Sequence, residues 1–505
     1  MGFIDFHSKP HTSRPWRFLV PLLLVSWLLL MIDLEGKSLW TDELFTVEWA
    51  RLSFKALIQR TAADVHPPLY FLLVRTWTRW SGFSDFALRW PSVAAAWLSI
   101  PLLYRLAKAW KGPRAAGMSA ALWGMAPVVI LYGRMARYYG LAACFGLLAT
   151  VMLWQALTMD KKRCWIAYVV ASSAAVYTFY LTALLLIAHG GLVLAFKSKR
   201  KLLSWLAAGA LSALTLAPWI PIVLDQTVRT GQGAADLSFS VMGLLLKVGY
   251  TAYALALGES LFPWHMLAVA GGLAVLVLFV TGFLNWRKKG RGLLLPLLGM
   301  IALPVLGMIL VTTLISPRTP FVSMPARAFF ALPYAFLLFG GYAPSKSIVQ
   351  RAVPFVVLVS WSMSLFNYYT DQHFLNPIYL TPAREIAAQV VSELQAGDVI
   401  YSPQDSGFYY YYDRMQARQP DFQDEAAALA AARTDAVKRV WVLTLGRDQT
   451  RENAPTELQT YLDTEYTLAQ TWAYVPQDPI YRAIKSRLLH REAYDYRAVL
   501  SLYTR

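Results

Sequence analysis

Asp42 and Glu43 form an adjacent acidic pair directly after the first long apolar stretch of the chain. Carboxylates at the rim of a bilayer are costly, so such a pair indicates a functional role. A carboxylate can accept the proton of a hydroxyl group, which makes this pair a candidate general base. Because neighbours on a helix do not share a face, we expect one residue to act on substrate and the other to pair with a cation or brace the loop. The alternative is that both are solvated loop carboxylates.

Asp64 and His66 precede two consecutive prolines, Pro67 and Pro68. A proline restricts the residue before it to extended geometry, so this corner of the chain is predicted to be rigid and able to aim a side chain. We therefore interpret Asp64 and His66 as substrate-binding candidates. The alternative is a helix breaker with incidental polar residues.

Arg134, Arg137 and Tyr138 are spaced by three and four residues, which predicts that they share one helical face. Arginine binds phosphate through a planar fork of donors, so two arginines at the end of apolar spans indicate a lipid phosphate. The alternative is that both arginines extend toward the lipid headgroups. Arg327 is a similar candidate with the same alternative.

These groups together suit one reaction class, the displacement of a polyprenyl phosphate from a sugar. Polyprenyl phosphate leaves as a stable anion, so no strong general acid is needed, whereas the developing charge needs Arg or Lys. The acceptor hydroxyl needs one base, so an inverting displacement requires only one carboxylate. A retaining glycosidase would need two facing carboxylates.

Composition shows which kind of chain must position these residues. The 505 residues are 57% hydrophobic and only 15% charged, against roughly 25% in ordinary soluble domains. Residues 377–505 contain 17 acidic and 14 basic side chains, while residues 1–376 contain 13 acidic and 33 basic ones. We therefore expect a basic, apolar membrane domain over 1–376 and a soluble domain over 377–505. Lys and Arg hold cytoplasmic loops inside, so the net charge of +17 reflects topology and does not indicate nucleic-acid binding.

The apolar stretches predict a polytopic α-helical membrane protein with about 11 spans of roughly 20 residues each. Basic clusters between the spans place the N-terminus in the cytoplasm and the C-terminal domain outside. Two further apolar stretches, Leu69–Trp80 and 240–262, carry charges and are predicted to lie on or partly in the outer leaflet. The predicted spans are 16–32, 91–109, 114–133, 137–157, 164–180, 181–196, 202–223, 266–285, 292–314, 326–342 and 349–368.

The loop after the first span is predicted to hold two short interfacial helices. Thr41 can cap one that ends at Ala50, and Ser53 can cap one that ends at Ala62. The chain beyond residue 377 has α/β patterning, with helices at 383–394, 425–433 and 456–466 and strands at 398–402, 439–445, 471–475 and 498–503. The sequence carries no GxGxxG, no P-loop and no zinc-type Cys/His spacing, so its cofactors are unknown and a divalent metal is possible but not indicated.

Several of these motifs resemble those of the GT-C membrane glycosyltransferases. The similar segments are Trp40–Glu43 after the first span, His66–Leu73 beyond it and Phe86–Ser92 at the start of the next span. The nearest resemblance is to the bacterial family-39-like group, which is related to protein O-mannosyltransferases and to the lipid A aminoarabinose transferase. Arg134–Tyr139, Ala326–Gly341 and the chain from Thr381 to Val442 also resemble segments of that group.

This resemblance implies transfer of a hexose or pentose from a polyprenyl-phosphate carrier to a glycan, lipid or protein acceptor outside the cytoplasm, in a bacterial inner membrane. It implies that Asp42 is the general base with Glu43 in support, and that Arg137 is the motif arginine. Arg134 stands where relatives often have an acidic or amide residue. His66 stands where the lipid A branch has a lysine, so the resemblance favours the mannosyltransferase-like or generic bacterial branch.

Two other functional classes remain open from the sequence. A transporter or flippase of a lipid-linked saccharide would place charges near the bilayer midplane and show related halves. A membrane assembly protein with its active partner elsewhere would not require Asp42. The polar candidates of this chain instead collect at one predicted rim, which favours the transferase.

Overall fold

The computed structural model describes residues 16–232, 241–289, 291–314, 323–342, 348–402, 407–416, 424–445, 456–489 and 496–505. The chain forms two compact units. The first contains the chain up to Leu34 and Thr46–Phe366, and the second contains Glu35–Phe45 and Asn367–Arg505. The short segment Glu35–Phe45, which the sequence places in the membrane domain, therefore belongs to the second unit. The division predicted after residue 376 places this segment in the other domain.

Among its described residues, the first unit contains helices joined by short loops and no strand. Its helices are α1 (Trp16–Met31), the second half of α2 (Thr41–Arg51), α3 (Phe54–Ala63), α4 (Leu69–Ser81), α5 (Asp85–Lys111), α6 (Pro113–Met125), α7 (Pro127–Arg134), α8 (Tyr139–Met159), α9 (Lys162–Thr178), α10 (Thr182–Ala195), α11 (Lys199–Leu216), α12 (Ile220–Gln232), α13 (Val241–Leu257), α14 (Met266–Lys289), α15 (Arg291–Leu314), α16 (Met324–Ala328), α17 (Leu332–Phe339) and α18 (Ile348–Tyr369), whose last residues belong to the second unit.

Each predicted span overlaps one or more of these helices, which confirms the mostly helical membrane architecture. Within the described residues, six helices are long and apolar enough to cross a membrane, or seven if the bent pair α6–α7 is one span. Shorter apolar helices cover Trp16–Met31, Thr182–Ala195, Val241–Leu257 and Met324–Phe339. The number of eleven crossings and their orientation stay predictions.

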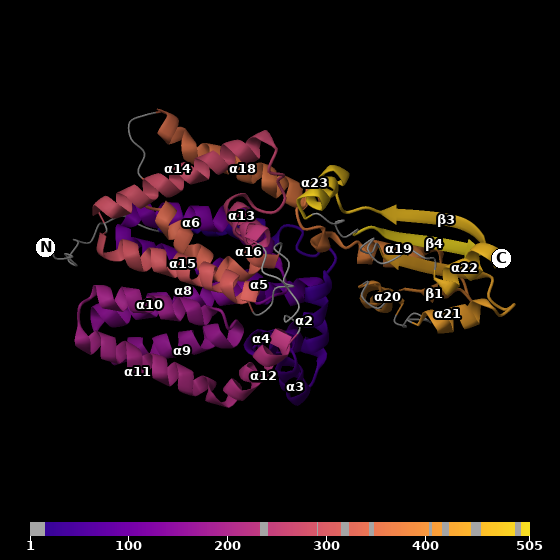
Figure 1. The fold of residues 1–505 in the computed structure, drawn as a ribbon, viewed down its shortest axis with the longest axis horizontal. Helices are drawn as coiled ribbons and strands as arrows, with labels where there is room; N and C mark the ends of the chain where they lie inside the picture. The colour runs from indigo at the N-terminus through magenta and orange to yellow at the C-terminus, as the bar shows by residue number, and fades with distance from the viewer. Residues whose placement is uncertain are drawn as a thin grey trace. The chain divides into compact units, whose positions relative to one another are not determined.

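Helices α8 to α11 form a packed group and run side by side in Figure 1. The 55° bend between α6 and α7 has a local cause. Pro127 opens α7, and Ala126 before it is extended, with φ −66° and ψ 131°, because a following proline disfavours the helical conformation. Beyond this bend, α7 ends at Arg134 and leads into the segment that carries Arg137.

The loop helices begin as two different signals dictate. Ser53 caps α3, since its side chain accepts a hydrogen bond from the Ala56 N–H at 3.2 Å, as predicted. The prediction that Thr41 caps α2 is wrong, because Thr41 is already helical. The α2 terminus is instead capped from inside: the Glu43 carboxylate accepts from the Trp40 N–H at 3.3 Å. A Glu at the third helical position can reach back in this way to the residue before the helix.

The second unit contains a four-stranded sheet in the order β1-β2-β4-β3 (Figure 1). β1 and β2 are parallel, and β4 is antiparallel to both β2 and β3. A parallel pair needs a crossover connection, which the helices between β1 and β2 provide. The elements are η4 (Pro377–Leu380), α19 (Ala383–Glu393), β1 (Val399–Tyr401), α20 (Phe408–Gln416), α21 (Glu425–Ala432), β2 (Arg439–Leu445), α22 (Glu457–Glu465), β3 (Thr467–Tyr474), α23 (Pro479–Leu489) and β4 (Ala498–Thr504).

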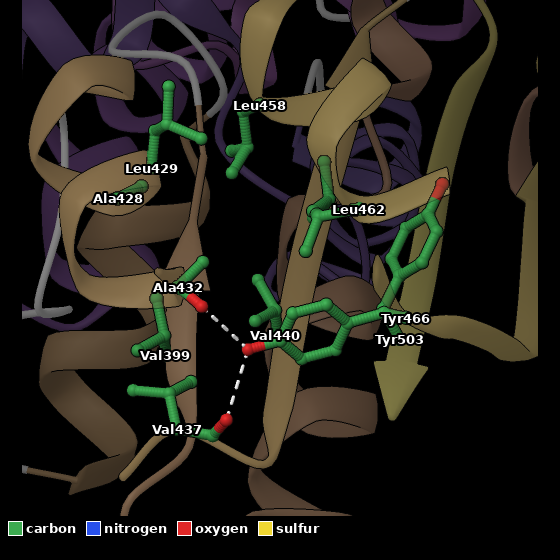
Figure 2. Close-up of a cluster of buried hydrophobic side chains, with 11 residues drawn as sticks. Val399, Ala428, Leu429, Ala432, Val437, Val440, Leu458, Leu462, Tyr466 and Tyr503 are labelled. Carbon is green, nitrogen blue, oxygen red and sulfur yellow. Dashed lines mark hydrogen bonds between the residues drawn. The ribbon is translucent and has the colours of Figure 1, made fainter. Parts of the chain in front are cut away.

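Figure 2 shows the hydrophobic cluster on one face of this sheet. Val440 and Val442 of β2 meet the apolar side chains of α21 and α22 there, because alternate residues of a strand share a face. The Tyr466 hydroxyl, at the end of α22, is shared between the carbonyl oxygens of Ala432 and Val437 at 2.9 and 3.0 Å. The sheet therefore has its own core, which holds α21 and α22 against β2.

Every helix and strand predicted beyond residue 377 has a counterpart in this unit, although β3 starts four residues earlier than expected. Helices α20 and α23 were not predicted. The aromatic run Phe408–Tyr412 in α20 favours neither a helix nor a strand decisively by its pattern.

Candidate functional site

Asp64, His66 and Arg137 form a continuous polar cluster in the first unit. The His66 Nδ1 lies 2.5 Å from the Asp64 Oδ2, and the Arg137 Nη2 lies 3.1 Å from the His66 Nε2. The Tyr138 ring lies 5.5 Å from the His66 ring, and the Arg137 guanidinium lies 5.2 Å from the centre of the Tyr138 ring. Four of the predicted substrate-binding residues are therefore brought together.

Hydrogen bonding dictates the proton positions in this cluster. Arginine has donors only, so the His66 Nε2 must accept from Arg137 and the ring proton must sit on Nδ1. That proton is donated to the Asp64 carboxylate. Burial raises the pKa of Asp64, but the hydrogen bond from His66, the Val65 amide and the Arg137 charge outweigh it and leave the pKa below its usual value of 3.8. Asp64 is thus ionised at neutral pH and holds His66 in the tautomer that orients Arg137.

The backbone that carries Arg137 is held by two side chains from other helices. Thr46 of α2 donates to the Ala136 carbonyl, and Ser92 of α5 donates to the Arg137 carbonyl, both at 2.8 Å. Gly140 permits this close approach, since a Cβ there would lie 2.8 Å from the Ser92 carbonyl oxygen. The arginine is therefore presented from a braced segment.

The prediction that Arg134, Arg137 and Tyr138 share one helical face is wrong. Helix α7 ends at Arg134, Met135 is extended with φ −72° and ψ 139°, and α8 starts only at Tyr139. Arg134 points elsewhere: its Nη2 donates to the Asp33 carbonyl at 2.7 Å, and its side chain is buried. This contact ties the end of α7 to the residues that follow α1.

Arg327 has a second cation as a neighbour. Lys247 of α13 is 7% exposed, and the Arg327 guanidinium is close enough to repel its ammonium group. The Lys247 Nζ donates to the Thr312 carbonyl at 3.2 Å and to the Thr313 hydroxyl at 3.4 Å. In the sequence, Lys247 is one of the charges that indicate that residues 240–262 do not cross the membrane. A lone lysine in an apolar stretch is itself a functional signal.

Glu259 is a further buried carboxyl that sequence reasoning did not select. It is 1% exposed and accepts a hydrogen bond from the Tyr132 hydroxyl of α7 at 2.5 Å. Burial outweighs the hydrogen bonds of Tyr132 and Tyr250 and raises the pKa of Glu259 to about 8. A protonated Glu259 therefore anchors the helix that leads into the Arg134–Tyr138 segment.

This pKa predicts a pH-dependent stability that Glu259→Gln removes. A carboxyl whose folded pKa exceeds its unfolded value of 4.5 stabilises the fold most at low pH. That stability is lost as the pH rises toward about 8, at about 1.4 kcal/mol for each unit of pH. We expect the wild-type Tm in detergent to fall more steeply than the Glu259→Gln Tm between about pH 5 and about pH 8. Parallel Tm profiles of the two proteins would contradict a buried, protonated Glu259.

Asp42 and Glu43 lie in the first turn of α2, within the part of that helix that belongs to the second unit. Glu43 is 1% exposed and bonds the Trp40 amide, whereas Asp42 is half-buried. The structure thus separates the roles of the pair, with Glu43 bracing the helix start. Among the described residues, no group of three or more His, Cys, Asp and Glu side chains is arranged to hold a metal ion.

Residues 65–224 match the family model of dolichyl-phosphate-mannose-protein mannosyltransferases. No curated protein matches the sequence. Among solved structures, ArnT from Cupriavidus metallidurans in the apo state superimposes with a TM-score of 0.52 at 13% identity, covering 97% of this chain and 98% of ArnT. The same protein bound to undecaprenyl phosphate gives a TM-score of 0.52 at 13% identity, covering 96% and 98%.

The match begins one residue after Asp64. It includes His66 and the whole Arg134–Tyr138 segment, which supplies the rest of the polar cluster. The resemblance predicted from short motifs is confirmed, and the chain has the fold of the ArnT structures.

Proposed function

We propose that this protein is an inverting glycosyltransferase that moves a sugar from a polyprenyl-phosphate carrier to an acceptor outside the cytoplasm. The observation that carries the proposal is the oriented Arg137 guanidinium, held by the Asp64–His66 pair within the segment that matches the mannosyltransferase model. The shared fold with an ArnT structure bound to undecaprenyl phosphate supports a lipid phosphate as the ligand.

The reaction needs one bond to form and one to break at the anomeric carbon. An acceptor hydroxyl attacks that carbon, its proton passes to the Asp42 carboxylate, and the bond to the phosphate oxygen breaks. The donor phosphate carries one negative charge, and the departing polyprenyl phosphate carries two. Groups that bind the second charge act more strongly in the transition state than in the ground state, which is what raises kcat.

Arg137 is the principal group for that charge, because a guanidinium matches phosphate oxygens through two parallel donors. Tyr138 supports it by lying beside the guanidinium. Arg327 and Lys247 are two further cations of the first unit that we assign to the donor phosphate. Arg134 acts indirectly, by holding the end of the first span through the Asp33 carbonyl.

Asp42 is the proposed base and Glu43 its support. Glu43 accepts a hydrogen bond from the Trp40 amide, and the Asp42 side chain is half-buried. The lipid tail of the donor would lie in the bilayer of a bacterial inner membrane, with the acceptor approaching from the outer side. The sugar is a hexose or a pentose.

Purified protein incubated with a panel of polyprenyl-phosphate sugars and candidate acceptors tests the proposal. Consumption of one donor with release of polyprenyl phosphate, and inversion at the anomeric carbon of the product, is the expected result. Movement of a lipid-linked sugar across vesicles with no bond cleavage would instead identify a flippase. Retention of anomeric configuration would remove the single-base mechanism.

A further inference from the structure

The segment from Glu35 to Trp40 leads into α2 and is built into the second unit. The Leu39 amide donates to the Tyr411 hydroxyl of α20 at 2.7 Å. Leu39 is 0% exposed and Tyr411 is 2% exposed, so this bond is shielded from water. Because Leu39 lies two residues before Thr41, where α2 starts, its partner controls the backbone that presents Asp42.

Arg384, at the start of α19, holds the same segment at two more points. Its amide donates to the Ser38 hydroxyl at 3.1 Å, and its Nη1 donates to the Glu35 carbonyl at 2.5 Å. The Ser38 hydroxyl in turn donates to the Glu385 carboxylate at 3.2 Å. The Arg384 guanidinium also lies 5.1 Å from the centre of the Tyr411 ring, so α19 and α20 act on the segment together.

Side-chain packing continues this attachment up to α2 itself. The Trp40 ring meets the Tyr379 ring edge-on, with centroids 5.0 Å apart. Gly407, with φ +68°, lies directly before α20, and a Cβ there would be 3.1 Å from the Leu44 Cδ1. Residues on both sides of Asp42 are thus in contact with the chain beyond residue 367.

We propose that the part of the second unit beyond residue 367 positions the Asp42 carboxylate, with Tyr411 and Arg384 as positioning residues. This inference rests on the proposed function, because the residue that is positioned, Asp42, is the proposed base. Tyr411 and Arg384 act on Asp42 through the backbone of Glu35–Trp40, so they are positioning residues and not catalytic ones. The Glu43–Trp40 bond carries the constraint from that backbone into the first turn of α2.

Tyr411→Phe is the direct test, because it removes only the hydroxyl that accepts from Leu39. A small misplacement of a reacting group can lower a rate by up to about 100-fold. We expect kcat of the full-length enzyme to fall about 10- to 100-fold, with KM for the polyprenyl-phosphate donor changed little. Arg384→Met, which removes the bond to the Glu35 carbonyl, should lower kcat in the same way.

Tyr466→Phe is the matched control. It removes an equally buried hydroxyl from the same unit, but this hydroxyl bonds Ala432 and Val437 in the cluster of Figure 2, away from the Glu35–Phe45 segment. It should lower Tm and leave kcat at the wild-type level. A purely structural role for Tyr411 predicts the same pattern for both variants, and that result would overturn the positioning role.

Hydrogen exchange of the peptide containing Glu35–Phe45 provides a readout that does not need activity. Tyr411→Phe should accelerate exchange there, and Tyr466→Phe should not. If the wild type transfers sugar, Asp42→Asn does not, and Tyr411→Phe keeps full kcat, the positioning role fails while the proposed function stands. If no donor is consumed by the wild type, the proposed function fails, and unchanged exchange in Tyr411→Phe would overturn the attachment as well.

Discussion

Replacing Asp42 by Asn is expected to lower kcat by about 10²- to 10⁴-fold, the usual contribution of a positioned general base. The substitution keeps the size of the side chain and removes its ability to accept a proton from the acceptor hydroxyl. KM for the polyprenyl-phosphate donor should change little, because Asp42 is not assigned to the phosphate. Initial-rate measurements over both substrate concentrations, normalised to folded protein, check this expectation.

Glu48→Gln is the matched control for Asp42→Asn. Glu48 lies on the same helix, α2, but its side chain is exposed, so its loss of charge should leave kcat unchanged. A Tm close to that of the wild type would show that each variant is folded. Full activity of Asp42→Asn would remove Asp42 as the base and direct attention to Glu43 or Asp64.

The second large effect is expected for Arg137→Lys, which keeps the charge but loses the planar fork of donors. Groups that stabilise developing charge in the transition state contribute about 10²- to 10³-fold to kcat, and a lysine does not replace a bidentate arginine. We therefore expect kcat/KM for the donor to fall by about that factor. The affinity for free polyprenyl phosphate, measured by titration, should fall in parallel.

Arg75→Lys is the control for Arg137→Lys. Arg75 is also buried, at 8% exposure, and its Nε donates to the Leu52 carbonyl at 2.8 Å, but it is outside the Asp64–His66–Arg137 cluster. Its replacement should lower Tm without a specific effect on donor binding. Wild-type kcat/KM in Arg137→Lys would contradict the assignment of the phosphate to this cluster.

The sequence was sufficient to predict the strands and most of the helices. Apolar stretches of the right length predicted helices such as α8 and α15 because backbone groups in lipid can be satisfied only within a helix or a closed barrel. Alternating and helical periodicity predicted β2, β4 and α22 because the buried face repeats along each element. The Ser53 cap and the break at Pro67 follow from side chains a few residues apart. Such local features need no knowledge of distant contacts.

The candidate site was predicted only in part. The sequence selected Asp64, His66 and Arg137 as substrate-binding residues, but it did not indicate which of them bond to one another. Their pairing depends on the path of the chain between residues 66 and 137, which no local pattern contains. The extended Met135 redirected Arg134 and Arg137 to different partners, against the helical spacing. Lys247 and Arg327 also meet only through folding.

The sequence by itself determined what kind of protein this is: a basic, apolar helical chain with carboxylates and arginines at its loop ends, followed by a soluble α/β region. Only the tertiary structure decided that Glu35–Phe45 belongs with the C-terminal unit and that Tyr411 receives the Leu39 amide. The physical reason is sequence separation. Periodicity and caps act over a few residues, whereas this hydrogen bond joins residues 372 positions apart and forms only when both elements have folded.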